Sequence, residues 1–88
     1  MGYKVELHSD VAHFLKWECS AAEREAFNAL MRKLEEEPIK HSMSFRDPEI
    51  SRYMIRRARF GSCIAVFSFD QARTKIRIRK CRKLAKNQ

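Results

Sequence analysis

The N-terminal part of the chain shows a strand pattern followed by a helix pattern. Apolar residues alternate with charged ones from Tyr3 to Leu7, and this period of two predicts a half-buried strand. Apolar residues then recur at helical spacing between Val11 and Leu15, which predicts a short amphipathic helix. Ser9 or Asp10 is expected to cap this helix, because either side chain can accept a hydrogen bond from a free backbone N–H.

The clearest helix pattern follows at residues 21–37. Ser20 and Glu23 have the spacing of a capping box, and apolar residues recur at positions 27, 30, 31 and 34. Pro38 is expected to end the helix, because proline disfavours helical geometry in the residue before it. Residues 39–50 contain a second proline and several polar residues, so we expect a loop there.

Strand patterns occupy the C-terminal part of the chain. Tyr53 and Ile55 belong to one predicted strand, and the aromatic and β-branched run at residues 63–69 forms the next, after a turn at residues 60–62. A last strand is predicted at residues 74–81, where apolar and cationic residues alternate. Its two isoleucines should lie on one face. The other face should carry Lys75, Arg77 and Arg79.

These elements predict a single α+β domain over residues 1–88, in the order β-α-α-β-β-β. We expect the two helices to form a hairpin packed on one face of a small, antiparallel-rich sheet, with the other face left exposed. A chain of 88 residues is long enough for one hydrophobic core and too short for a second. Any functional site therefore has to share that core.

Basic residues concentrate in the predicted sheet. The first 50 residues carry seven basic and ten acidic side chains, whereas residues 51–88 carry twelve basic ones and a single acid, Asp70. The C-terminal part is too rich in Ile, Val and Phe to be a disordered basic tail. We expect one face of the sheet to bind a phosphate backbone, with a salt-dependent affinity, because each neutralised phosphate releases counterions.

Other kinds of site are not indicated by the sequence. The chain has no run of 18 apolar residues and no signal-peptide pattern at residues 1–7, so we expect no membrane span and a cytoplasmic location. Cys19, Cys63 and Cys81 are odd in number and lack metal-type spacing, which predicts reduced, structural thiols. The histidines also lack such spacing, and we predict no metal and no cofactor. One histidine could serve as a base in a cleft, and the sequence does not select it.

The segment from Arg52 to Arg57, followed by Gly61 and by the run from Ile64 to Asp70, is similar to a hairpin of the RelE/ParE superfamily, the toxins of type II toxin-antitoxin modules. The predicted element order and the basic sheet also resemble that superfamily, over nearly the whole chain. The resemblance implies a RelE-like fold and an acidic cognate antitoxin as a partner. For the RelE branch it implies an endonuclease that acts on messenger RNA in the ribosome, where the 2′-hydroxyl attacks the adjacent phosphate.

The same resemblance implies site residues. Arg56 falls where RelE proteins often have a lysine, and Lys83 falls near a further functional basic residue, so these two are the catalytic candidates. Met54 and Cys63 replace other basic residues of the family, and the usual C-terminal tyrosine is missing. Arginine stays protonated at pH 7 and is a poor general base. The candidates for RNA binding are the other cations of this region: Arg52, Arg57, Arg59, Lys75, Arg77, Arg79, Lys80 and Arg82.

Two alternatives to the nuclease remain open at this point. One is a ParE-like inhibitor of DNA gyrase that needs no nuclease chemistry. The other is a non-catalytic module that binds RNA or a protein through the same sheet. Phe60, at a predicted turn, is a candidate for stacking on a base in any activity that uses single-stranded RNA.

Overall fold

The computed structural model describes residues 2–44 and 54–84. They form β1 (Lys4–Leu7), α1 (Ser9–Trp17), α2 (Ala21–Glu36), β2 (Met43–Ser44), β3 (Met54–Phe60), β4 (Cys63–Asp70) and β5 (Lys75–Lys83). The order confirms the predicted β-α-α-β-β-β arrangement and adds β2, which at two residues is too short to show a period in the sequence. Arg52, a predicted RNA-binding residue, and Tyr53 lie outside the described residues.

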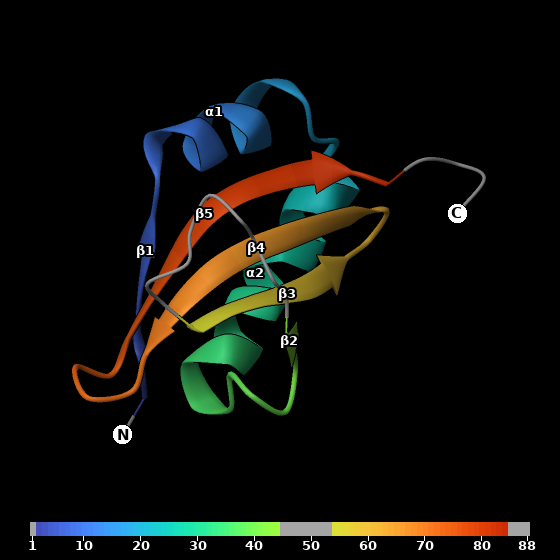
Figure 1. The fold of residues 1–88 in the computed structure, drawn as a ribbon. Coiled ribbons are helices and arrows are strands. Elements are labelled where there is room, and N and C mark those ends of the chain that lie inside the picture. The colour runs from blue at the N-terminus through green and yellow to red at the C-terminus, as the bar shows by residue number, and fades with distance from the viewer. Residues whose placement is uncertain (1, 45–53, 85–88) are drawn as a thin grey trace.

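The strands form one sheet in the order β1-β5-β4-β3-β2 (Figure 1). β1 runs parallel to β5, and the other neighbours are antiparallel, as an antiparallel-rich sheet requires. Gly61 and Ser62 connect β3 to β4 in a tight turn, where Gly61 has a φ of 55°, a conformation that glycine adopts without steric cost. None of the described helices is long and apolar enough to span a membrane.

The two helices begin with different kinds of N-cap. Ser20 and Glu23 form the expected capping box, in which each side chain bonds the other residue's backbone N–H, and α2 begins at Ala21. The predicted cap of α1 was wrong: His8 is the N-cap, and its Nδ1 accepts a hydrogen bond from the backbone N–H of Asp10. Histidine is an uncommon N-cap, so Ser9 and Asp10 were the more favourable candidates by residue type.

Both helices pack on one face of the sheet and share its core. Val11 and Phe14 of α1 join the α2 stripe and the alternating apolar residues of the strands in a single buried cluster. The buried strand residues on this helix side include Ala58 and Phe60 of β3 and every second residue of β4 from Cys63 to Phe69. The opposite face therefore receives the remaining strand residues, including the cations of β3 and β5.

A β-bulge in β5 decides which of its cations reach that opposite face. Phe67 pairs with Ile78, and the adjacent Val66 pairs with Lys80, so Arg79 is the one residue of β5 that the pairing with β4 skips. Each side chain of β5 after Arg79 therefore lies on the face opposite to the one that regular alternation from Lys75 would predict.

The bulge turns Lys80 and Arg82 away from the helices, because their partner positions on β4 also face that way. Cys81 and Lys83 turn toward the helix side for the same reason. The predicted alternation of the last strand is therefore correct only up to the bulge.

Candidate nucleic-acid interface

Seven cations gather on the face of the sheet that lies away from the helices. We call this surface the basic face. It is formed by Arg57 and Arg59 of β3 and by Lys75, Arg77, Arg79, Lys80 and Arg82 of β5. All seven were predicted as RNA-binding residues, and the fold brings them onto one surface from two strands that are separated by β4.

The middle of the basic face contains two rows of residues across three strands. One row consists of Arg57, Val66 and Lys80. The next consists of Arg59, Ile64 and Arg82. Each row places a cation on either side of a buried apolar residue, and neighbouring strands lie about 4.8 Å apart. Positive charges about 10 Å apart thus flank the centre of the sheet, an arrangement that suits the phosphates of a nucleic-acid backbone.

Acidic residues partly neutralise the other end of the basic face. Glu6 of β1 lies 3.4 Å from the Nζ of Lys75 and 3.9 Å from the Nε of Arg77. Asp70 lies 3.8 Å from the Nε of Arg73 in the turn before β5. These pairs are partly exposed and add little stability, but they lower the positive potential around them. The positive potential of the basic face is therefore reduced near Glu6 and Asp70.

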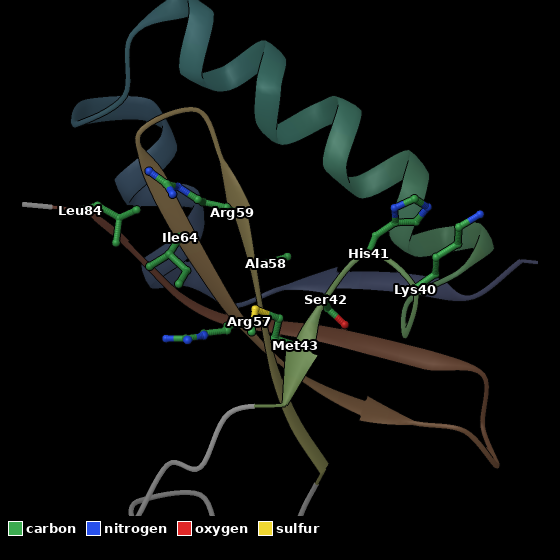
Figure 2. Close-up of a pocket in the computed structure, with 9 residues that line it drawn as sticks. All are labelled: Lys40, His41, Ser42, Met43, Arg57, Ala58, Arg59, Ile64 and Leu84. Atoms are coloured by element: carbon green, nitrogen blue, oxygen red, sulfur yellow. The ribbon is translucent and has the colours of Figure 1, made fainter. Parts of the chain in front are cut away.

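An open groove lies beside the rows, at the edge of β3. Its volume is about 610 Å³. It lies where β2 ends, because β2 pairs only with Arg56 and Arg57, and among the described residues no strand covers the rest of that edge of β3. Figure 2 shows Arg57 and Arg59 extending from β3, with Lys40 and His41 on the segment that follows α2. The groove is lined by Lys40, His41, Ser42, Met43, Arg57, Ala58, Arg59, Ile64 and Leu84.

The groove offers three kinds of contact. The guanidinium groups of Arg57 and Arg59 can bind phosphate oxygens through several parallel N–H donors. Met43 and Leu84 provide apolar surface for a base or a side chain. His41, half-buried, adds an imidazole that can accept or donate a proton. The sequence could not select His41, because its position depends on how the chain returns from α2 to β2.

Arg56, a predicted catalytic residue, lies on the helix side of β3 rather than on the basic face. Its Nε donates to the hydroxyl of Ser42 at 2.6 Å, and one terminal nitrogen donates to the carbonyl oxygens of Ser42 at 2.9 Å and Ile39 at 3.3 Å. The other terminal nitrogen lies 3.4 Å from the hydroxyl of Ser44. The guanidinium group of Arg56 therefore holds the α2–β2 connection against β3.

Lys83, the other predicted catalytic residue, also points to the helix side. Its Nζ lies 3.7 Å from a carboxylate oxygen of Glu23 on α2. Arg56 and Lys83 pair with Phe67 and Cys63 of β4, which are four residues apart, so the two cations are separated by about 13 Å along the strand direction alone. The fold does not bring the predicted catalytic pair together.

The prediction that Phe60 stacks on a base was also wrong. The ring is 3 % exposed, and its centroid lies 5.1 Å from that of Phe27 of α2 in an edge-to-face arrangement. Phe60 ends β3 on the helix side, immediately before the turn, so it belongs to the core although a turn follows it. A ring with this burial has no face left for a nucleobase.

Comparisons with known proteins identify the fold. The chain superposes on a chain of the archaeal RelE-RelB complex from Pyrococcus horikoshii OT3 with a TM-score of 0.82 and 22% sequence identity, covering 98% of this chain and 99% of that one. It has the RelE fold. A chain of the toxin-antitoxin complex RelBE2 from Mycobacterium tuberculosis matches with a TM-score of 0.70 and 16% identity, over 94% of this chain and 99% of that one. No protein-family model and no curated protein sequence matches the chain.

The likeness to the RelE fold extends over nearly the full length of both neighbours. It therefore includes the sheet, both helices and the hairpin from which the basic face is built. At these sequence identities the likeness establishes the fold and not the chemistry, so the activity has to be argued from this chain's own side chains.

Proposed function

We propose that this protein is the toxin of a type II toxin-antitoxin module and that it cleaves messenger RNA on the ribosome. The observation that carries the proposal is the pair of cationic rows beside the groove, on a RelE fold. Arg57 and Arg59, one cation from each row, line the groove together with His41. The RelE fold of two toxin-antitoxin complexes supports the same role.

The reaction needs three contributions from the protein. A base takes the proton of the 2′-hydroxyl, cations stabilise the crowded phosphate, and a donor protonates the leaving 5′-oxygen. Arg57 and Arg59 are the phosphate ligands in this proposal, because both line the groove. His41 is the proton acceptor, since imidazole is the side chain most suited to proton transfer near neutral pH and His41 lines the same groove. Arg56 and Lys83 take no direct part.

An acidic antitoxin is the proposed protein partner, and the cytoplasm is the proposed location. Of the two similar structures named above, one is a RelE-RelB complex and the other a toxin-antitoxin complex, which supports an antitoxin partner. The net charge of +8 would speed the encounter with an acidic chain by electrostatic steering. Such a partner and RNA would compete for the same cations, so antitoxin binding would inhibit the toxin.

Inhibition of DNA gyrase without nuclease chemistry is the second candidate. One observation favours it: Arg56 and Lys83, the residues matched to the RelE catalytic positions, both make contacts within the fold. A gyrase inhibitor or a non-catalytic binding module needs the basic face but no general base. The two activities therefore differ in whether His41 matters.

Primer-extension mapping of a model message, incubated with the purified protein, tests the proposal directly. We expect cuts when programmed ribosomes are present and none with the message alone. The matched variants are His41→Ala and His13→Ala, since His13 is exposed on α1. His41→Ala should slow cleavage by about 100-fold, the usual contribution of a general base, and His13→Ala should not.

One result would contradict the nuclease: a message that stays intact with ribosomes. A gyrase supercoiling assay on the same preparation would then test the second candidate. Equal cleavage by His41→Ala and the wild type would contradict only the role of His41, since the ribosome-dependent activity would still be present.

A further inference from the structure

Two of the three cysteines meet a glutamate at the end of the molecule opposite the β4–β5 turn. Cys19 precedes the N-cap of α2, Glu23 lies in the first turn of α2, and Cys63 begins β4. One donor atom from each residue lies within 4.8 Å of the other two. The Sγ of Cys63 is 3.3 Å from a carboxylate oxygen of Glu23. Cys19 and Cys63 are 44 positions apart in the sequence, so their spacing does not indicate a metal site.

The cluster is sheltered from solvent. Cys63 is fully buried, Cys19 is 8 % exposed, and the Glu23 side chain is 13 % exposed. Burial and the nearby Glu23 carboxylate raise the pKa of Cys63 to about 12. In the absence of a cation, two protonated thiols therefore surround a carboxylate.

We propose that Cys19, Cys63 and Glu23 bind a single zinc ion. Zinc accepts both thiolate and carboxylate ligands, whereas magnesium and calcium require oxygen ligands and copper(I) prefers sulfur alone. Three protein ligands leave one tetrahedral position for water, which can enter beside the exposed Ser62 and Lys83. The proposal is independent of the function proposed for the basic face.

The charges around the cluster suit this ion. Binding converts two thiols to thiolates and releases two protons, so that the zinc ion, two thiolates and the Glu23 carboxylate carry a net charge of −1. Lys83, whose Nζ lies 3.7 Å from Glu23, then neutralises the site from outside the ligand set. The contact between Lys83 and α2 would thus be part of the surroundings of a metal site.

The ion would connect three parts of the fold. Cys19 belongs to the α1–α2 connection, Glu23 to α2, and Cys63 to the β3–β4 hairpin that carries Arg57 and Arg59. Zinc would therefore hold the hairpin of the basic face against the helices. Its binding should stabilise the folded state, because the unfolded chain keeps these ligands apart.

Titration of the full chain with cobalt(II), in the presence of a phosphine reductant, tests the site. Cobalt is a spectroscopic substitute for zinc, and we expect sulfur-to-cobalt charge-transfer absorption that saturates at one equivalent and disappears when zinc is added. Native mass spectrometry should show one zinc per chain. The melting temperature should rise on addition of zinc and fall again with a chelator.

Variants separate this site from ordinary thiol binding. Cys19→Ser should lower zinc affinity at least 10-fold, and Glu23→Gln should do so while keeping the capping box, which glutamine also forms. Cys81→Ser is the matched control, because Cys81 is a free thiol outside the three-residue group, and we expect wild-type affinity. Circular dichroism of each variant without metal checks that the fold is kept.

Three results would overturn the proposal. One is the absence of stoichiometric cobalt or zinc binding by the reduced, folded protein. A second is equal loss of affinity in Cys81→Ser and Cys19→Ser, which would show that the ligands are not the three residues named here. The third is unchanged affinity in folded Glu23→Gln together with folded Cys19→Ser.

Discussion

The Nζ of Lys83 lies 3.7 Å from the carboxylate of Glu23, on the side of the sheet opposite Arg82, its neighbour in the sequence. The bulge at Arg79 sets this arrangement, because it fixes the faces of all later residues of β5. Two adjacent cations of equal charge therefore have different surroundings, and a charge count along the sequence cannot distinguish them.

Arg82→Ala should weaken RNA binding more than Lys83→Ala. Arg82 belongs to a cationic row of the basic face, and among the described residues it has no acidic partner. We expect Arg82→Ala to reduce the slope of log affinity against log salt concentration by about 0.7, the effect of one lost phosphate contact. Filter binding of single-stranded RNA at several salt concentrations measures this slope. Lys83→Ala is the control, and an equal loss in both variants would show that the basic face is not the binding surface.

Arg56→Ala should destabilise the fold by about 1–3 kcal/mol, because it removes charge-assisted hydrogen bonds that hold the α2–β2 connection. Arg56→Lys should not restore the loss, since an ammonium group cannot replace the planar set of guanidinium donors. Urea denaturation gives the free energy of unfolding. Arg59→Ala, which removes an exposed arginine from the same strand, should change it by less than about 0.5 kcal/mol. An Arg56→Ala protein as stable as the wild type would show that these contacts contribute nothing.

Phe60→Ala should destabilise the fold by about 3–5 kcal/mol, the usual cost of removing a buried aromatic ring. Phe60→Leu should cost less, because it fills part of the space against Phe27. The measurement is again urea denaturation, followed by RNA binding under conditions in which the variants are folded. Unchanged stability with weakened RNA binding would restore the stacking role that the buried ring argues against.

Most of the fold could be predicted from the sequence because it rests on local patterns. The α2 stripe, the capping box of Ser20 and the alternation before the bulge each involve residues that are close in the chain. The site was less predictable, because it depends on the faces of β3 and β5. Arg56 and Arg57 are neighbours with the same charge, and only the pairing of β3 with β4 determines which of them faces the helices.

The groove and the cysteine cluster depend on contacts between distant segments. His41 reaches the groove because β2 ends the pairing at Arg57, and no local pattern marks a two-residue strand. Cys19 and Cys63 meet because α2 packs across the β3–β4 hairpin. Such positions require the tertiary structure, since the residues between them carry no period that relates one to the other.

Glu6→Gln should strengthen RNA binding at low salt. Glu6 lies within 4 Å of Lys75 and Arg77, so removing its charge raises the positive potential at that end of the basic face. We expect an increase of a few-fold in affinity that disappears at high salt, because screening removes the contribution of the added charge. Glu25→Gln is the control in the same filter-binding series, because it changes the net charge by the same amount but lies on α2, away from the basic face. Equal gains in the two variants would attribute the effect to net charge alone.

The stabilising effect of Glu23 should disappear at low pH. The backbone N–H of Ser20, the hydroxyl of Ser62 and the thiol of Cys63 donate to its carboxylate and lower its pKa from 4.5 to about 2. A lowered pKa in the folded state means that the stabilisation is fully present above pH 4.5 and is lost as the pH falls toward 2. The difference in unfolding free energy between the wild type and Glu23→Gln, measured with urea in the presence of a chelator, should therefore be constant near neutral pH and shrink between pH 4.5 and 2. Glu25→Gln is the control, because it loses no hydrogen bond within the described residues, and its unfolding free energy should follow that of the wild type at every pH. A difference in unfolding free energy between the wild type and Glu23→Gln that stays the same from pH 7 to pH 2 would contradict this account.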